Sequence, residues 1–278
     1  MPKSISDTAH WVAFCRAMES ERPDALFRDP FARLLAPANG SAPGSAMFSR
    51  FAADVVAIRT AVMDEIILKA VRDYQVDMVL NLAAGLDARA YRLPLPRDLR
   101  WIEVDLPEVL AYKSAILNGE AAACSLESTA LNLLDPDRVQ LLDRLNGEAN
   151  RILVLSEGLL VYLTPDDVAA LAADLHRQQN FHYWLTDLMA PRSMRIMSAF
   201  ACRQLAQANA RLRFAPMDLR AFFGDLGWRA IELHPGLSEM RRLNRHTTVP
   251  ASLLSILKIV RGNRLQSMDG TALFERSG

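Results

Sequence analysis

The sequence predicts an α/β protein built around a largely parallel β-sheet. Short apolar runs alternate with helical stretches along the chain, a pattern typical of parallel strands joined by helices. In one of these runs, Val79, Leu80 and Leu82 are apolar without a helical period, as expected for a central strand that is covered on both faces. With 278 residues, of which 51% are hydrophobic, the chain can bury a large core.

We expect a single domain without internal repeats. Residues 1–74 would form a helical cap, residues 75–250 an α/β core with a helical insertion at about 190–215, and residues 251–278 a C-terminal helix and tail. Within the cap, helices are expected at 6–21, from Asp29-Pro30 onwards, and at 47–74 with one break at most. The segment 36–46 is rich in Ala, Pro, Gly and Ser, so it is either a lid or a plain surface connection.

The core elements are expected to follow in alternation. Strands are predicted at 78–82, 99–105, 125–133, 151–155, 183–188, 228–234 and about 241–249. Helices are predicted at 107–117, about 135–145, from 165 onwards, at 190–215, at 216–226 and at 253–260. The helix after Thr164 has the clearest start, because Thr can cap, Pro165 suits the first helical position and two acids follow where the helix dipole favours them.

The composition limits which partners, metals and cellular locations are expected. The formal net charge is zero, which gives no global field to attract nucleic acid or an anionic membrane, so neither is expected as a partner. Six Lys or Arg residues without an acid lie between Arg241 and Arg264, and they indicate a solvated face or an anion site. The three cysteines and five histidines show no metal-ligand spacing, so no metal is expected and a cytoplasmic location is the simplest. The polar N-terminus and the lack of an 18-residue apolar run predict neither a signal peptide nor a membrane span.

The turn after the first strand, Ala83-Ala84-Gly85, indicates a ligand site. Small residues allow a close approach of the backbone, and a strand-to-helix turn is where open α/β sheets bind nucleotides. The turn lacks the Gly-x-Gly-x-x-Gly of dinucleotide sites and the Gly-Lys-Ser/Thr of phosphate loops. Asp87 would repel phosphate but suits a cationic amine, which points to S-adenosylmethionine. The alternative is a small-residue turn between buried elements.

Four polar residues follow the first four strands, and parallel strands bring their carboxyl ends to one edge. They are Asp87, Asp105, Asn132 and Glu157. An acid at the end of the second strand can hold a ribose diol, although Asp105 could equally cap the next helix. Glu157 lies in an apolar stretch and therefore needs a cationic partner, either a ligand or a nearby residue such as Arg59 or Arg89.

Four stretches resemble the leucine carboxyl methyltransferase family, and most closely its bacterial branch, which includes polyketide O-methyltransferases. They are DTAHWVAFCRAMESERPDALFRDPFA, VLNLAAGLDARAYRL, WIEVDLPEVLAYK and LSEGLLVYLTPDDV, in the order of the family, and the resemblance runs from about Ser6 to Asn244. It implies a class I S-adenosylmethionine-dependent methyltransferase fold. Such a fold has a seven-stranded, mostly parallel sheet with an antiparallel final strand and helices on both faces.

The resemblance also implies roles for individual residues. Arg59 would pair with the methionine carboxylate of the cofactor, Ala83 to Asp87 with Gly85 between them would form the loop beneath it, and Asp105 would hold the ribose. Asn132 and Leu133 would flank the adenine, Glu157 would lie near the methionine amine or the acceptor, and Tyr162 would face the acceptor pocket. The family usually has Gly at the position of Ala83 and Asp at that of Asn132, and both departures could weaken cofactor binding.

The predicted activity is O-methyl transfer to a carboxylate or hydroxyl of a small molecule, for example a polyketide-type secondary metabolite. The three motifs at the strand ends contain no histidine, which slightly favours a carboxylate, because a carboxylate needs no general base. Glu157, Tyr162 or His10 could still act as a base. Two other functions stay open: a non-catalytic binding protein that keeps the fold, and a nicotinamide-dependent oxidoreductase, which the missing third glycine disfavours. The sequence leaves the oligomeric state open.

Overall fold

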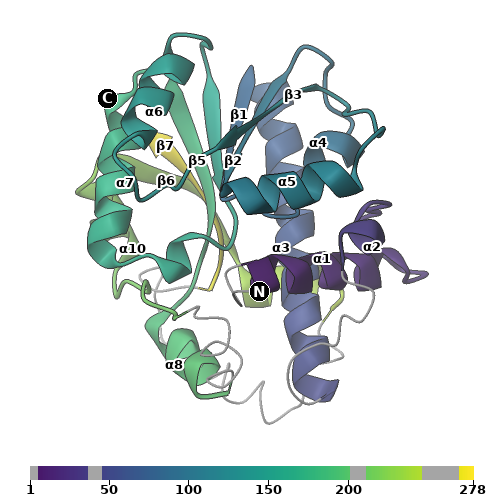
Figure 1. Cartoon of the computed structure of the whole chain (residues 1–278). Coiled ribbons are helices and arrows are strands. Elements are labelled where there is room, and N and C mark those ends of the chain that lie inside the picture. Colours follow the sequence, from purple (N-terminus) through teal and green to yellow (C-terminus); the bar gives the residue numbers. More distant parts are fainter. Residues whose placement is uncertain (1–5, 37–45, 201–210, 246–268) are drawn as a thin grey trace.

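A seven-stranded sheet in the order β3-β2-β1-β4-β5-β7-β6 forms the centre of the protein (Figure 1). It is seen in a computed structural model that describes residues 6–36, 46–200, 211–245 and 269–278. β7 runs antiparallel to both its neighbours, and the other paired strands are parallel. The strands are β1 (Met78–Leu82), β2 (Arg100–Asp105), β3 (Ser125–Ala130), β4 (Ile152–Ser156), β5 (Phe181–Leu188), β6 (Trp228–Pro235) and β7 (Gly270–Arg276). The predicted seven-stranded, mostly parallel sheet is confirmed.

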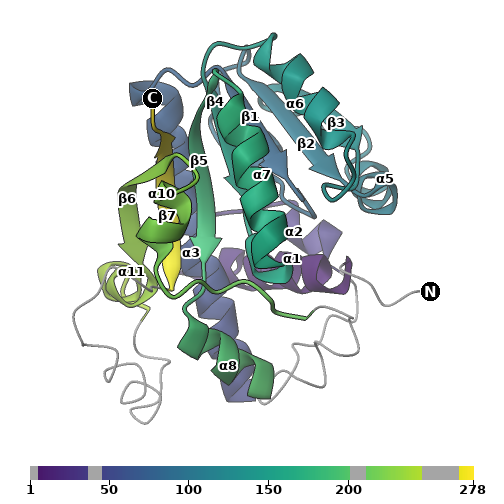
Figure 2. The same cartoon turned by 90° about the vertical axis from the view of Figure 1, so that its left-hand side faces the viewer.

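Helices cover both faces of this sheet. The helical segments are α1 (Ser6–Ser20), α2 (Ala32–Leu35), α3 (Ala46–Asp73), α4 (Arg89–Arg92), α5 (Pro107–Ile116), α6 (Arg138–Asn146), the 3-10 turn η1 (Leu160–Tyr162), α7 (Pro165–Arg177), α8 (Pro191–Phe200), α10 (Leu219–Gly224) and α11 (Gly236–Arg242). Figure 2 shows α7 in front of the sheet and α3 behind it. None of the described helices is long and apolar enough to cross a membrane.

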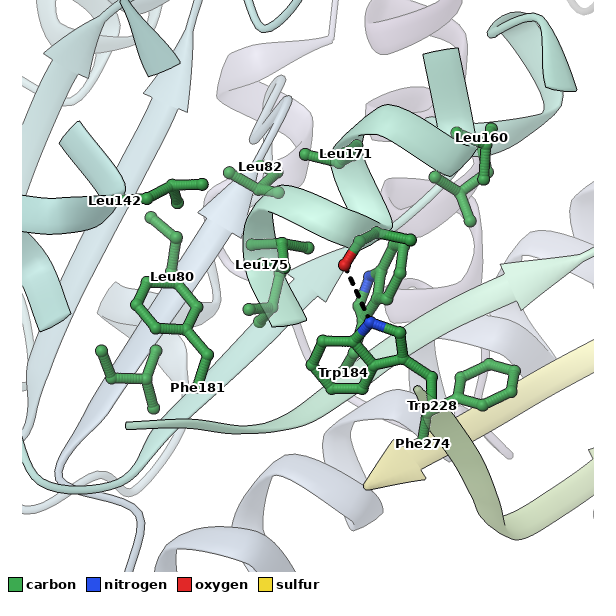
Figure 3. Packing of buried hydrophobic residues seen from close by; sticks show 14 of the residues in the cluster. Leu80, Leu82, Leu142, Leu160, Leu171, Leu175, Phe181, Trp184, Trp228 and Phe274 are labelled. Atoms are coloured by element: carbon green, nitrogen blue, oxygen red, sulfur yellow. Dashed lines mark hydrogen bonds between the residues drawn. The ribbon is translucent and has the colours of Figure 1, made fainter. Parts of the chain in front are cut away.

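Apolar side chains fill the space on each face. β1 and β4 are buried along their whole length, as a central parallel strand requires. One cluster joins β1 to α6, α7 and α10, and Figure 3 shows its centre, where the indole nitrogen of Trp228 donates to the Ala172 carbonyl oxygen (3.0 Å). A second cluster packs α3 and α4 against the opposite face. The sheet is therefore a rigid support for the loops at its edges.

The start of α7 follows the sequence prediction. The Thr164 side chain accepts a hydrogen bond from the Asp167 amide, and the Asp167 side chain accepts one from the Thr164 amide. This reciprocal capping satisfies two backbone donors that have no partner within the helix. Helix α3 also agrees with the prediction, and it continues without a break from Ala46 to Asp73.

Three predicted elements differ from the structure. The strand expected at about 241–249 is wrong in its first part, because Gly236–Arg242 forms α11, whose apolar residues recur with a helical period, and the last strand is β7. The tail expected at 251–278 thus ends in a strand. Residues 211–215 are not helical, since the amides of Arg213 and Phe214 both donate to the Val161 carbonyl. The third strand ends at Ala130 rather than 133. The predicted lid at 36–46 and the helix at 253–260 lie almost wholly or wholly outside the described residues.

Candidate functional site

The loop after β1 is tightly shaped and tied to β2. Ala83 and Gly85 both have a φ of 52°, in the left-handed region that glycine adopts without strain. The Ala84 amide donates to the Val104 carbonyl and the Asp87 amide donates to the Ala84 carbonyl, each at 3.1 Å. The loop therefore turns back on itself at the carboxyl edge of the sheet. The predicted small-residue turn is where the sequence placed it.

Asp105 closes this loop from the end of β2. One of its carboxylate oxygens accepts from the Gly85 amide at 2.6 Å, and the other accepts from the Leu106 amide at 2.7 Å. Burial raises the pKa of Asp105, and the two amides only partly offset this. A carboxylate has about four acceptor positions, so two bonds leave capacity for a diol. The geometry fits both the predicted ribose contact and a structural role in the loop.

Glu157, after β4, lies at the centre of a buried cluster of arginines. Both its oxygens accept from Arg16 at 2.9 Å, one also accepts from Arg59 at 3.0 Å, and the other accepts from Arg89 at 2.5 Å. Burial alone would raise the pKa of Glu157, but the three guanidinium groups hold it well below its ordinary value. The carboxylate is therefore firmly ionised. Its cationic partners in this structure are residues of the chain.

Three further acids balance these arginines. Asp87 accepts from Arg89 at 2.8 Å and from Asn81 at 3.1 Å. Asp187, at the end of β5, accepts from Arg59 at 2.8 Å and from the Gly158 amide at 2.5 Å. Asp64 of α3 accepts from Arg89 at 2.6 Å and from Arg92 at 2.7 Å. The result is a continuous ion-pair network across the carboxyl ends of β1, β4 and β5.

The structure brings most of the predicted residues together. Arg59, Asp87 and Glu157 belong to the network. Gly85, two positions before Asp87 in the sequence, is hydrogen-bonded to Asp105. Tyr162 lies beyond Glu157 on η1, where its side chain is hydrogen-bonded to Thr8 of α1. Burial raises the pKa of the Tyr162 hydroxyl.

Asn132 and Leu133 lie in the turn after β3. Asn132 is exposed, and its side-chain oxygen accepts from the Leu134 amide within the same turn. Leu133 is partly buried against the core. No described contact joins these two residues to the ion-pair network, so their role beside an adenine stays a prediction.

Several members of the network, among them Arg16 and Asp187, had no predicted site role. Arg16 is only 3% exposed and contacts Glu157. A signal was present, because Ala9, Ala13 and Arg16 share one face of α1, and small residues allow a helix to approach its neighbour closely. Ala9 indeed lies beside Gly85, 3.5 Å from where a side chain on that glycine would begin. Asp187 was another omission, although it too ends a parallel strand.

The basic segment starting at Arg241 is also corrected in part. Arg245 is buried rather than solvated, and it donates to Glu19 at 2.7 Å and to Asp24 at 3.0 Å. Arg242 pairs with Glu65 at 2.8 Å. These arginines hold helices together, because each has acids from other elements beside it. Arg241 is exposed on α11, and the other three basic residues of the segment lie outside the described part of the chain.

The order of the strands, the antiparallel β7 and the acid of β2 over the loop of β1 define a class I methyltransferase fold. Residues 9–176 match the leucine carboxyl methyltransferase family. Since this is more than half of the chain, the protein belongs to that family.

Relatives and solved structures agree with this assignment. A Streptomyces coelicolor protein, provisionally named an S-adenosyl-L-methionine-dependent methyltransferase, is 36% identical over 64% of this chain and 66% of its own length. A Parafrankia protein of the same provisional name is 35% identical over 62% of this chain, and the match spans only 59% of that relative. A DUF574 family protein from Streptomyces avermitilis has a TM-score of 0.59 at 11% identity, with 98% of this chain and 97% of that chain covered. At that identity the structural likeness concerns the fold alone.

Proposed function

We propose that the protein is an S-adenosylmethionine-dependent O-methyltransferase that acts on a carboxylate or hydroxyl of a small molecule. The observation that carries the cofactor assignment is the Asp105 carboxylate bonded to the Gly85 amide at 2.6 Å, at the carboxyl edge of the sheet. The names of the relatives support the same cofactor. A polyketide-type metabolite is one class of acceptor that fits this proposal.

The residues at the edge suit such a cofactor. Asp105 would hold its ribose, and the loop from Ala83 to Asp87 would lie beneath its methionine part. Arg59 and Glu157 already form an ion pair at 3.0 Å. A ligand that carries both a carboxylate and an ammonium can exchange with this pair without leaving a net buried charge, because each partner finds the opposite charge on the ligand. The network therefore supports a zwitterionic ligand group at this position.

The protein residues around the site suggest how they would assist the reaction. When bound, S-adenosylmethionine supplies a methyl group activated by a positive sulfur. The α1 helix would exclude water, since Arg16 anchors it over the loop, and a water-poor site strengthens the electrostatic interactions within it. Orientation of the acceptor would then account for most of the rate.

The titration behaviour of the site favours a carboxylate acceptor. A hydroxyl would need a general base, and Glu157 and Tyr162 were the two proposed catalytic residues. Glu157 is a weak base because three arginines lower its pKa. Tyr162 is protonated at neutral pH, as an ordinary tyrosine is, and burial raises its pKa further. His10 lies edge-on against the Tyr112 ring, with the ring centres 4.9 Å apart. A carboxylate is already ionised at neutral pH and needs none of them. We therefore assign Tyr162 to orienting the acceptor.

Calorimetric titration with S-adenosylhomocysteine tests the cofactor assignment. The wild-type protein should bind with micromolar affinity, and Asp105→Ala should bind at least about tenfold more weakly because the diol loses a charged acceptor. Asp73, which is exposed and pairs with its neighbour Arg72, is a suitable control, and Asp73→Ala should bind as the wild type does. Absence of binding by the wild-type protein would refute the proposal.

A panel of carboxylic acids and phenols then tests the acceptor class. Methyl transfer from radiolabelled S-adenosylmethionine should label carboxylic acids and give products that mild alkali hydrolyses, because methyl esters are labile to base. Alkali-stable products would mean hydroxyl or nitrogen methylation instead.

One alternative function has specific support. A binding protein that keeps the fold without catalysis would explain why Ala83 occupies a left-handed position and why Asn132 bonds within its own turn. Binding of S-adenosylhomocysteine without methylation of any acceptor in the panel, together with gain of transfer in an Ala83→Gly/Asn132→Asp variant, would favour this alternative.

A further inference from the structure

A buried lysine lies beneath the candidate cofactor loop. Lys113 of α5 is 3% exposed, and its ammonium donates to the Glu103 carboxylate of β2, which is 1% exposed, at 2.6 Å. Burial raises the pKa of Glu103 even though Lys113 pairs with it. Two buried charges of this kind often stabilise a fold less than a pair of apolar residues would. The pair therefore calls for an explanation beyond packing.

The same ammonium reaches the loop. Lys113 donates a second hydrogen bond, to the backbone carbonyl oxygen of Asp87. The Asp87 carboxylate is held from the other side by Arg89 and Asn81. Asp87 is thus held at both its backbone and its side chain. Since Asp87 is bonded to Ala84, its position affects the rest of the loop.

The charge of Lys113 also acts on the loop's other partner. Asp105 lies near Lys113, which lowers the pKa of its carboxyl, and near Glu108, which raises it. Glu103 and Asp87 are the other acids close to the ammonium. The Lys113 ammonium is thus close to three buried carboxylates around the loop, and its charge favours the ionised form of Asp105 that would accept hydrogen bonds from a ribose.

We propose that Lys113 is a positioning residue of the cofactor site, which sets the shape of the Ala83–Asp87 loop through the Asp87 carbonyl, with Glu103 serving to hold the lysine in place. This inference rests on the proposed function for the identity of the ligand. The held loop itself is a property of the protein without any ligand.

Three variants separate positioning from simple stability. Lys113→Met removes the ammonium, keeps most of the side-chain volume and leaves Glu103 buried without its partner. Lys113→Met/Glu103→Leu replaces the whole pair by apolar side chains, which relieves that cost. Lys69→Met is a control for loss of a lysine that pairs with a glutamate. Lys69 of α3 pairs with Glu232 of β6 at 2.7 Å, and this pair is more exposed than that of Lys113.

The variants should change stability, ligand affinity and loop exchange. Lys113→Met should lower the melting temperature, and the double variant should recover it. Both should bind S-adenosylhomocysteine roughly tenfold more weakly than the wild type, because binding would have to restore the loop shape that the charged hydrogen bond of Lys113 holds. In the ligand-free protein, hydrogen–deuterium exchange over residues 84–88 should be faster in both variants. Lys69→Met should change neither the affinity nor the exchange.

Two results in the double variant would overturn the positioning role of Lys113: affinity for S-adenosylhomocysteine equal to that of the wild type, and unchanged exchange of the loop. These results differ from those that would refute the proposed function. If the wild type binds no S-adenosylhomocysteine, the proposed function fails, and the exchange measurement still decides whether Lys113 holds the loop.

Discussion

At the scale of single residues, Ala83 has a backbone conformation that is unusual for a residue other than glycine. Ala83 and Gly85 have the same φ of 52°, but only Gly85 is free of a side chain that disfavours it. The left-handed conformation costs an ordinary residue roughly 1–2 kcal/mol. The loop therefore stores strain at the point where it leaves β1, and its hydrogen bonds to β2 must offset that strain.

Exchanging the residue types at these two positions should change stability in opposite directions. Ala83→Gly should raise the free energy of unfolding by up to about 1 kcal/mol, since the relieved strain exceeds the entropy that glycine adds to the unfolded chain. Gly85→Ala should lower it by about 1 kcal/mol or more. The new methyl group would meet Ala9 at an ordinary 3.5 Å, so backbone strain rather than a clash is tested. Urea unfolding measures both; equal losses in the two variants would contradict the interpretation.

Ion pairing at Asp87 should make stability depend on pH in the acid range. Its pKa falls from 3.8 to about 2, because Arg89 and Arg16 together outweigh the opposing effect of burial. A pKa lower in the folded than in the unfolded state contributes stability that is complete above about pH 4 and is lost as the pH falls towards 2. Asp87→Asn should therefore cost roughly 2–3 kcal/mol at pH 7.

The cost of Asp87→Asn should shrink at pH 3. Urea unfolding of the variant and the wild type at both pH values measures it. The exposed Asp73 provides the control, and Asp73→Asn should unfold like the wild type at both pH values. A cost that stays the same at pH 3 would mean that the amide disturbs packing rather than charge.

Among the elements, α1 connects the most distant parts of the site. Thr8 contacts Tyr162 after β4, Ala9 lies beside Gly85 after β1, and Arg16 binds Glu157. Its amphipathic pattern predicted a helix at the correct residues. The pattern could not indicate which charged residue would be buried, because an arginine on the border of an apolar face is usually solvated.

Removing the anchor of α1 should loosen the helix before the rest of the protein. Arg16→Met should lower the free energy of unfolding by about 2–3 kcal/mol, less than for a fully broken buried pair because Glu157 keeps Arg59 and Arg89. Hydrogen–deuterium exchange in α1 should increase more than in α7. Arg33→Met is the control, since its pair with Glu21 is half exposed and is worth less than about 1 kcal/mol. Equal effects of the two substitutions would argue against an anchor.

At the scale of the whole molecule, the C-terminal strand completes the sheet from within. β7 lies between β5 and β6, pairs with both, and brings Phe274 against Phe223 with ring centres 4.5 Å apart. Without β7, β6 would lose its partner strand in the described sheet and β5 would be paired on one side alone, with β4. The end of the chain is therefore part of the core.

Truncating the central aromatic residue of β7 should destabilise the whole fold. Phe274→Ala should cost about 3–5 kcal/mol, the range for emptying a buried phenylalanine position. Met217→Ala should cost almost nothing, because Met217 is 77% exposed. Urea unfolding followed by both far-ultraviolet dichroism and tryptophan fluorescence should give one common transition. A loss below about 1 kcal/mol for Phe274→Ala would show that the core can collapse around the gap.

Much of this fold follows from interactions between neighbours in the chain. The apolar run of β1, the turn at Gly85, the cap of α7 and the acid after β2 were all predicted at the correct residues. Strand burial, capping and turn chemistry are decided by residues a few positions apart, so a single sequence contains them. The sequence also predicted that the polar residues at the strand ends lie close together, because the carboxyl ends of parallel strands share one edge of the sheet.

Other features, the pairing of buried charges and the place of the last strand, depend on contacts between segments that are far apart in the sequence. Arg16 and Glu157 are 141 positions apart, and no local pattern pairs one arginine with one acid among many. The same holds for β7, whose short apolar run is compatible with a strand or a helix until β5 and β6 offer it partners. Charge pairing and strand insertion depend on which surfaces remain after the sheet has formed, and that information exists only in the tertiary structure.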